Sequence, residues 1–568
     1  MVELWQITLP TSLSGCGSRF WRGVPTAAMQ NRFVNSPQRI VLSSSLSILG
    51  GPISLGFSGS SVGMDFAPSV GMATATEFSY RSRKPDVGVL HRVVRKHLET
   101  FLHEFAARGG GAPLPAFLER ELREFLTCGF LARGFARFRC DGCAAEHLVA
   151  FSCKGRAVCP SCTGRRMNER SADLVDRVLG GLPMRQYVLT VPHRLRFWMI
   201  FDHRLCRSVL AVLHRALLGM QRRRAKHLGL LDPKCGAVTA IQRCGSALNV
   251  NVHFHTLMPD GVFVEAGDAG GEEGAFRRLP PPSDDEVQRL LLTIRRRVLR
   301  LLRRRGLFDE DGAEMPGDKA AACLSGFAEA ALRGRVATGR RAGSRLRRLG
   351  GDPDAAWLPA SGRRHAHVEG FDLHAAIGVK AQNRKGLERL ARYILRPPVA
   401  QGRLALRDDD NIVLKLPRSW ADGTTHIVFE PSEFLERLVT LTPRPRINLI
   451  IYSGVFAGHA RGRSAAVARA LQTAQTATAP ASLPGEAQPA RPEQRHYRWA
   501  DLMRRAFAVD VLACRRCDAR LRLIATIESP EAIRRILTHL GLPTILPRPD
   551  PARAPPGHTS DFFEDFSA

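Results

Sequence analysis

Two histidines at alternate positions form the first group of residues suited to chemistry. They lie in the run NVNVHFH (residues 249–255), where polar and apolar side chains alternate without a break. On a strand, alternate side chains share one face, so His253 and His255 converge while Phe254 enters the core. On a helix the two rings would lie about 200° apart. The alternation therefore predicts a strand that presents two neutral imidazole ligands to a metal ion.

A third ligand is expected from the preceding run, Ala237–Cys244, which can pair back on this strand through a turn near Ser246–Leu248. In that register Gln242 faces His253 and adds an oxygen ligand. Taken alone, two alternating histidines also fit two polar positions on a solvent-facing strand. The metal interpretation depends on the residues that follow.

A tyrosine is the second reactive group. Tyr393 is one of five tyrosines and lies in the run GLERLARYILRPP, whose apolar spacing predicts a helix over residues 384–396. Its side of the helix is predicted to carry Gln382, Arg389 and Arg396. A phenol, with a pKa of about 10, is a poor nucleophile unless cations or a metal stabilise its oxyanion. Two arginines also suit a bound phosphodiester. The alternative is an amphipathic tyrosine packed at a helix edge.

Cysteine pairs form the third group. Cys140-Asp-Gly-Cys143 and Cys159-Pro-Ser-Cys162 are separated by 15 residues, a spacing that predicts one structural zinc ion held by four thiolates. Cys153 and His147 lie in the intervening loop, so the spacing leaves the four ligands open. Arginines flank this site at positions 156, 165, 166 and 170, and Arg165 and Arg166 are predicted to contact DNA. A further pair, Cys514 and Cys517, supplies only two ligands and leaves a second zinc site open.

The composition favours a polyanionic partner. The 568 residues contain 83 Lys and Arg against 53 Asp and Glu, a net charge of +30, and nucleic acid is the commonest partner of such a chain. No uncharged apolar run approaches the ~18 residues of a membrane span. Thirteen cysteines, clustered in CxxC pairs, indicate reduced thiols in the cytoplasm. Glu3 stands where a secretory signal would be positive. We expect a cytoplasmic, nucleoid-associated protein without a membrane or small-molecule partner.

The elements that must position these groups follow from periodicity. Helical patterns occupy 87–131, 204–228 and 286–305, and strands are expected at 186–192, 237–265, 412–416 and 426–429. Residues 266–285 are expected to be a loop. The predicted units are a poorly ordered extension (1–85), a helical and cysteine-rich unit (86–183), a central unit (184–405) with its continuation (406–465), a linker (466–495), a CxxC unit (496–545) and a disordered tail (546–568). Met64 and Met72 are later candidate starts, so residues 1–85 are expected to reflect an overextended gene start.

Taken in order, these motifs resemble a known family. The runs SCKGRAVCPSC, RQYVLTVPHRLR, IQRCGSALNVNVHFHTLMPDGVF, GLERLARYILRPP, RINLIIYSGVF and LACRRCDARLRLIATI are similar to those of the HUH rolling-circle transposases of the insertion-sequence ninety-one family. The resemblance covers roughly residues 90–530. It implies an α+β fold in which a mainly antiparallel HUH nuclease sheet with flanking helices follows a small helical, zinc-binding module. On this resemblance, residues 86–183 are the zinc-binding DNA-recognition domain, and residues 184–405, continued by 406–465, are the catalytic domain.

The resemblance also implies a mechanism. His253 and His255 would hold Mg²⁺ or Mn²⁺, and Tyr393 would attack single-stranded ends of a mobile element to give a 5′-phosphotyrosine link. Founding members have two tyrosines four residues apart, but Arg389 and Pro397 stand at the spacings where the second would lie. The chain therefore looks like the single-tyrosine branch. The alternatives are a plasmid replication initiator or relaxase of the HUH class, and a non-catalytic zinc-dependent DNA-binding protein.

Overall fold

The fold combines helices with antiparallel sheets. The computed structural model describes residues 84–264, 275–307, 319–352, 362–475 and 499–553. Within these ranges there are twelve α-helices and four sheets, and every named strand pair is antiparallel. The predicted α+β class is confirmed. The predicted extension lies almost wholly outside the described residues. No helix among the described residues is long and apolar enough to cross a membrane.

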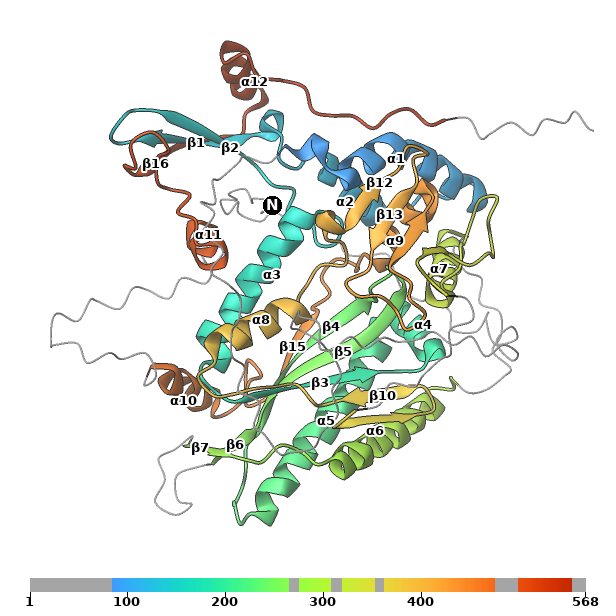
Figure 1. Cartoon of the computed structure of the whole chain (residues 1–568), viewed down its shortest axis with the longest axis vertical. Helices are drawn as coiled ribbons and strands as arrows, with labels where there is room; N and C mark the ends of the chain where they lie inside the picture. The colour runs from blue at the N-terminus through green and yellow to red at the C-terminus, as the bar shows by residue number, and fades with distance from the viewer. Residues whose placement is uncertain (1–83, 265–274, 308–318, 353–361, 476–498, 554–568) are drawn as a thin grey trace, which may run out of the picture.

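Both ends of the described chain build the zinc-binding region. Helices α1 (Val89–Arg108) and α2 (Ala116–Leu126) precede the hairpin of β1 (Phe135–Cys140) and β2 (Glu146–Ala150), and α3 (Pro160–Leu174) follows it. The third strand of this sheet, β16 (Leu521–Ile527), pairs with β1. It follows α11 (Trp499–Phe507) and precedes α12 (Pro530–His539). Figure 1 shows β16 beside β1 and β2, although these segments lie far apart in the sequence.

A seven-stranded sheet forms the centre of the molecule. Its order is β15-β4-β5-β3-β10-β9, and β11 (Gly378–Val379) pairs with β3 beside β10. The strands in that order are Ile450–Gly454, Gly236–Cys244, Val250–Pro259, Met184–Thr190, Phe371–His374 and His365–Val368. The predicted hairpin register is confirmed, because Gln242 lies opposite His253.

The two faces of this sheet have different roles. Val252 and Phe254 of β5 are buried in the core that includes α4 (His193–Phe201), α5 (His203–His227) and α6 (Asp284–Arg304). The intervening residues His253 and His255 point to the opposite face, where α3 and α8 (Arg384–Ile394) pack on a second core. The alternation of β5 therefore separates a structural face from a polar one.

The remaining elements surround this sheet. A four-stranded sheet has the order β12-β13-β14-β8, with bounds Leu404–Leu406, Ile412–Lys415, His426–Phe429 and Arg347–Leu349. Helices α7 (Lys319–Arg333) and α9 (Pro431–Leu441) pack on each other and on α1. Strands β6 (Gly261–Val264) and β7 (Ala275–Arg278) form a separate hairpin.

Four sequence-based boundaries differ from the structure. The predicted loop at 266–285 contains β7, which pairs with β6. The predicted linker begins within α10 (Arg463–Gln475), whose alanines favour a helix and whose Ala466 and Ala470 are buried. Residues 546–553 of the predicted tail run along α1, where the Asp550 backbone N–H donates to the Arg95 carbonyl at 2.9 Å. Helix α8 ends at Ile394, so Gln382 and Arg396 lie outside it.

Candidate functional site

The two histidines of β5 converge on one point. Their Nε2 atoms lie 3.0 Å apart, and their rings meet at 64° with centroids 4.8 Å apart. His253 is 8% exposed and His255 is 3% exposed. The strand brings the two side chains together because both belong to one face of the pleat.

Hydrogen bonds to the other ring nitrogens decide which form the rings take. His253 Nδ1 lies 2.8 Å from the Asn251 carbonyl, which can only accept, so Nδ1 carries the proton and Nε2 has a free lone pair. His255 Nδ1 lies 2.6 Å from the side-chain amide of Gln186 on β3. With the amide nitrogen at this contact, Gln186 Oε1 is buried without a hydrogen-bond partner.

If the Gln186 amide is rotated by half a turn, its oxygen and nitrogen exchange places and the oxygen gains a hydrogen-bond partner. Oε1 then accepts from His255 Nδ1–H, and the His255 Nε2 lone pair faces that of His253. Two lone pairs at 3.0 Å repel unless a cation lies between them. The donor set therefore fits a divalent metal ion, with Gln186 as the partner that orients one ligand.

Burial keeps both rings neutral. Burial, with a smaller contribution from Arg396, lowers the pKa of His253 to about 4. The same burial, together with His253, lowers the pKa of His255 well below its ordinary value. Neutral imidazole is the form that binds metal.

Tyr393 lies beside this histidine pair. Its ring meets that of His255 edge to face at 89°, with centroids 5.8 Å apart. The guanidinium of Arg396 stacks over the phenol at 4.3 Å from the ring centroid. The buried side of α8 is the predicted one, formed by Leu387, Leu390, Ala391 and Ile394. Tyr393 is half-buried and Arg389, one turn earlier, is exposed.

Gln242 links β4 to the end of α8. Its Nε2 donates to the carbonyl of Ile394 at 2.7 Å and approaches the carbonyl of Tyr393 at 3.4 Å. The Ile394 carbonyl is the last of the helix and has no partner within it, so the amide caps the helix and holds Tyr393 near β5. Because carbonyls can only accept, Nε2 must face them, and Oε1 is the atom left for a metal. Its role as a ligand stays a prediction.

A basic pocket adjoins Gln242. It has a volume of about 440 Å³ and lies among α3, β4, β15 and the end of α8. Its lining contains Tyr452, no acidic residue, and five arginines: Arg156, Arg166, Arg170, Arg243 and Arg396. Burial lowers the pKa of Arg243 to about 10. Such a volume suits a small ligand or a single nucleotide, and the arginines suit a phosphate backbone.

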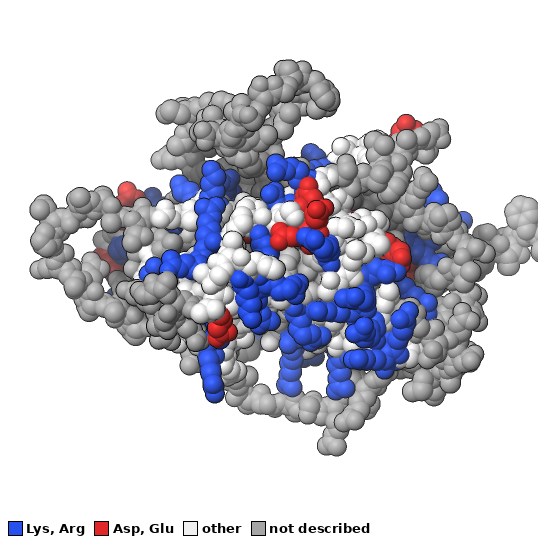
Figure 2. All heavy atoms as spheres, turned by 90° about the horizontal axis from the view of Figure 1, so that it is seen from below, with Lys and Arg blue, Asp and Glu red and all other residues white. Residues whose placement is uncertain are grey.

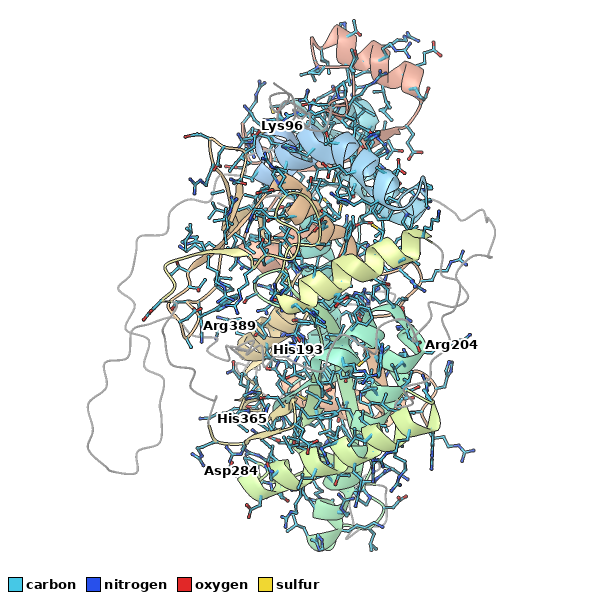
Figure 3. The ribbon with its side chains drawn as sticks, turned by 90° about the vertical axis from the view of Figure 1, so that its right-hand side faces the viewer. Lys96, His193, Arg204, Asp284, His365 and Arg389 are labelled. Atoms are coloured by element: carbon cyan, nitrogen blue, oxygen red, sulfur yellow. The ribbon has the colours of Figure 1, made fainter. Side chains whose placement is uncertain are left out.

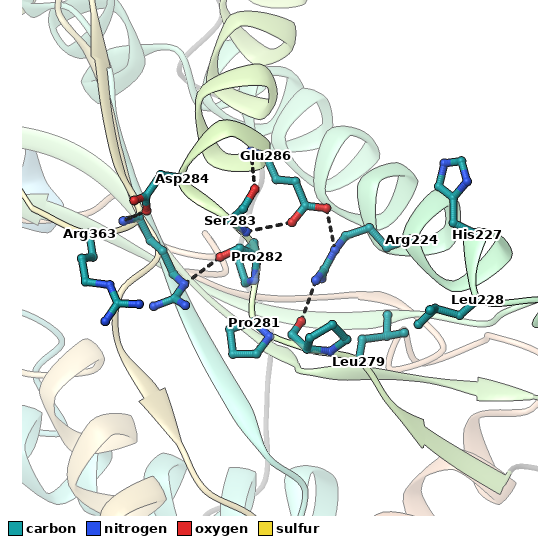
Figure 4. Close-up of a pocket in the computed structure, with 12 residues that line it drawn as sticks. Arg224, His227, Leu228, Leu279, Pro281, Pro282, Ser283, Asp284, Glu286 and Arg363 are labelled. Atoms are coloured by element: carbon teal, nitrogen blue, oxygen red, sulfur yellow. Dashed lines mark hydrogen bonds and ion pairs between the residues drawn. The ribbon is translucent and has the colours of Figure 1, made fainter. Parts of the chain in front are cut away.

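A second pocket, of about 570 Å³, lies at the start of α6 (Figure 4). Most of its polar side chains are engaged with neighbouring groups. Arg224 pairs with Glu286 at 2.9 Å and donates to the Pro280 carbonyl at 2.6 Å. Glu286 also completes a capping box with Ser283. These contacts connect α5 to the loop before α6, so we assign the pocket a structural role.

Four buried cysteines form the first zinc centre: Cys128, Cys153, Cys159 and Cys162. Three of their Sγ–Sγ separations are 3.5, 3.6 and 3.8 Å. Four sulfurs about 2.3 Å from a tetrahedral ion would lie about 3.8 Å apart, so this group fits zinc. Cys159 caps α3, and Pro160 occupies its first position. The ion therefore anchors the helix that carries Arg166 and Arg170 into the basic pocket.

The second centre joins the two ends of the chain: Cys140, Cys143, Cys514 and Cys517. Sγ–Sγ separations are 3.5 Å for Cys140 and Cys517, and 3.6 Å for Cys143 and Cys514. Backbone N–H groups, led by that of Cys143, lower the pKa of the Cys140 thiol to about 7. The thiolate is the form that binds zinc.

The predicted pairing of the two N-terminal CxxC turns around one ion is wrong. Cys159 and Cys162 combine with Cys153 and Cys128, whereas Cys140 and Cys143 combine with the C-terminal pair. His147 belongs to neither group. The spacing misled because each CxxC turn supplies two sulfurs but does not select its partner. Cys128 was missed because it stands alone, twelve residues before Cys140.

The structure also places the other predicted residues. Arg166 and Arg396 line the basic pocket, whereas Arg165 and Arg389 do not. Sequence reasoning missed Gln186, although the strand that contains it had been predicted. The alternation of Gln186, Val188 and Thr190 along β3 was the available signal, because Val188 pairs with His255.

A third polar group lies on the same sheet face, two strands from β5. Asp372 Oδ2 lies 2.9 Å from His365 Nε2, and Asp372 Oδ1 lies 2.8 Å from His374 Nε2. The imidazoles stack 3.9 Å apart at 7°. A metal ion binds a histidine nitrogen in the plane of its ring, and an ion in the plane of one of these stacked rings would lie well outside the plane of the other. In this arrangement the two histidines therefore hold the Asp372 carboxylate between them and do not share a metal ion. Figure 3 shows His365 between Arg389 and Asp284 along the long axis.

Two family models match this chain. One, described as "Putative transposase", matches residues 236–464 and spans both histidines and Tyr393. The other, described as "Transposase zinc-binding domain", matches residues 93–191 and spans all four cysteines of the first zinc centre. No curated protein and no solved structure gives a significant match.

Together the two models cover more than half of the chain, in the order that the motifs predicted. The four-cysteine centres agree with a zinc-binding domain, so the zinc is structural. The two transposase models imply that DNA is the partner on which the enzyme acts. The chain belongs to the insertion-sequence ninety-one family of transposases and carries an N-terminal zinc-binding domain.

Proposed function

We propose that this transposase is a single-tyrosine HUH nuclease that cuts and rejoins single-stranded ends of a mobile element by a rolling-circle route. The observation that carries the proposal is the convergence of three side chains. The Nε2 atoms of His253 and His255 face each other at 3.0 Å, and the Tyr393 ring packs against His255. A helix cap from Gln242 holds the tyrosine in this position.

The chemistry follows from these groups. A divalent ion such as Mg²⁺ or Mn²⁺, held by His253 and His255 with Gln242 as third ligand, would polarise the scissile phosphate. The Tyr393 oxygen attacks phosphorus, its proton passes to water, and the 3′ oxygen leaves as a hydroxyl after taking a proton from water. Arg396 stabilises the developing phenolate through its stacked cation. The 5′-phosphotyrosine bond conserves the energy of the phosphodiester, so rejoining needs no nucleotide cofactor.

The basic pocket is the proposed path of the strand next to the cut. Arg166 and Arg170 from α3 and Arg396 beyond α8 face it from two sides. Tyr452 supplies a ring on which a base can stack. Arg165 and Arg389 flank this path and are proposed to add further phosphate contacts.

The test is a covalent adduct between the protein and a single-stranded oligonucleotide that carries an element end, detected by denaturing electrophoresis. Tyr393→Phe is expected to abolish the adduct and cleavage while leaving DNA binding within about twofold. Tyr452→Phe is the matched control, because it also removes one hydroxyl near the pocket, and it should keep the adduct. An adduct formed by Tyr393→Phe would disprove the nucleophile assignment.

A further inference from the structure

The face of the molecule behind the catalytic sheet carries a dense basic surface. We define the α5/α6 basic surface by the exposed residues Arg204, Arg207, Arg215, Arg222, Arg223 and Lys226 of α5, and Arg289, Arg296, Arg300, Arg303 and Arg304 of α6. Figure 2 views the molecule from below, where Lys and Arg far outnumber Asp and Glu.

The two helices run side by side in opposite directions. Near the end of α5, Arg224 pairs with Glu286 at the start of α6. At the other end, Arg305, just after α6, donates to Ser208 of α5 at 2.7 Å. Neighbouring helices lie about 8–10 Å apart, so their charges form two roughly parallel rows. From Arg204 to Lys226 the longer row spans about 33 Å.

Acidic residues are scarce on the two helices that form this surface. Helix α5 contains no Asp or Glu, and α6 contains none after Glu286. No residue of the α5/α6 basic surface forms an ion pair with another described residue. Packed like charges destabilise the folded chain unless a polyanion lies against them. Arg295 and Arg305 of the same region do have acidic partners, so pairing was available to neighbouring positions.

The residue types of α5 and α6 favour double-stranded DNA over single-stranded DNA as the ligand of this surface. Proteins that hold single strands stack bases on aromatic side chains, and neither α5 nor α6 contains an aromatic residue apart from histidine. Charge alone suits the backbone of a duplex, which carries about 20 phosphates over 33 Å. The surface also faces away from His253 and His255. Helix α5 packs on the other face of the sheet, where its His214 contacts Thr239 at 2.7 Å and Thr239 contacts Thr256 of β5 at 2.8 Å.

We propose that the α5/α6 basic surface binds double-stranded DNA without base specificity, while the single strand is cut on the opposite face of the sheet. The inference rests on the proposed function for the role of that other face. It would allow the enzyme to hold a duplex flank of the element end, or the target, during strand cleavage.

The test uses a quadruple variant, R289Q/R296Q/R300Q/R303Q, in which glutamine preserves helix propensity. Binding to a blunt duplex is measured over a range of salt concentrations on the Tyr393→Phe background, so that cleavage cannot interfere. The variant should bind the duplex more than tenfold more weakly. The slope of log affinity against log salt should fall by about 0.9 for each phosphate that the variant no longer neutralises. With Tyr393 intact, adduct formation on a short single strand should stay within about twofold.

A charge-matched control is K415Q/R461Q/R534Q/R535Q, which removes four exposed cations that lie outside α5 and α6. It should change duplex affinity much less than the α6 variant. Equal losses in both variants would mean that net charge alone matters, and an unchanged salt slope in the α6 variant would also overturn the proposal. Loss of single-strand binding with duplex binding intact would assign the surface to the displaced strand instead. If wild type forms no adduct, the nuclease proposal fails, whereas the duplex comparison still stands.

Discussion

At the scale of single residues, the Gln186 amide selects which nitrogen of His255 carries the proton. Its contact with His255 Nδ1 is short, at 2.6 Å, and neither partner is exposed to water. An oxygen at that contact holds the proton on Nδ1 and leaves Nε2 for a metal. A contact of this kind fixes the orientation of the ligand and raises its basicity.

Gln186→Leu should therefore weaken metal binding about 10–100-fold, because His255 loses the acceptor that selects its tautomer. The measurement is adduct formation against Mn²⁺ concentration, with direct Mn²⁺ binding to the Tyr393→Phe protein as a second readout. Gln186→Glu is the matched control, since a carboxylate also accepts from Nδ1–H and should keep metal affinity within a fewfold. Equal affinity in wild type and Gln186→Leu would show that the amide does not orient the ligand.

At the scale of elements, strand β5 combines two functions in consecutive residues. Phe254 is 0% exposed in the core with α5 and α6, and its two neighbours lie on the opposite face, which we propose to be catalytic. Stability and catalysis should thus respond to different residues of one strand.

Phe254→Ala should lower the free energy of unfolding by ~3–5 kcal/mol, because it leaves a cavity in that core. His253→Ala and His255→Ala should leave the melting temperature nearly unchanged in metal-free buffer, yet each should abolish cleavage. Gln242→Ala should reduce activity less than either histidine variant and loosen the end of α8. The melting temperature and the nicking activity are measured for each of the four variants. If the histidine variants unfold while Phe254→Ala stays stable, the two faces have been assigned the wrong way round.

At the scale of the whole molecule, the second zinc centre holds together segments about 370 residues apart in the chain. The Sγ atoms of Cys140 and Cys517 lie 3.5 Å apart, and β16 extends the sheet begun by β1 and β2. The two CxxC turns are alike. In each, a residue with positive φ follows the second cysteine, Ala144 in one and Asp518 in the other.

Metal analysis of the purified protein should find about two zinc ions per chain, one for each four-cysteine group. Cys514→Ser combined with Cys517→Ser should remove one ion and expose the C-terminal segment to proteolysis, while adduct formation on a short single strand persists. Cys128→Ser should remove the other ion and also impair cleavage, because that centre anchors α3. A single zinc in wild type, kept in the C-terminal double variant, would contradict the second centre.

The sequence by itself was sufficient for the local features. Alternation of period two is set by the pleat of one strand, so the faces of Asn249–His255 could be predicted without knowing what covers them. The buried side of α8 and the hairpin register that places Gln242 opposite His253 were also predicted from local patterns, and both are confirmed. The family resemblance followed from these motifs and their order.

Tertiary structure decided which distant residues share a site. A CxxC turn presents two sulfurs whatever lies beside it. The pairing of β1 with β16 brings Cys140 to Cys517. The packing of α2 against the loop after β2 brings Cys128 to Cys153. Likewise, the basic charge of α5 and α6 was visible in the sequence, but its location behind the central sheet was not. The spacing of residues along the chain determines which contacts are possible within one strand, helix or turn. Contacts between distant segments depend on how the whole core packs.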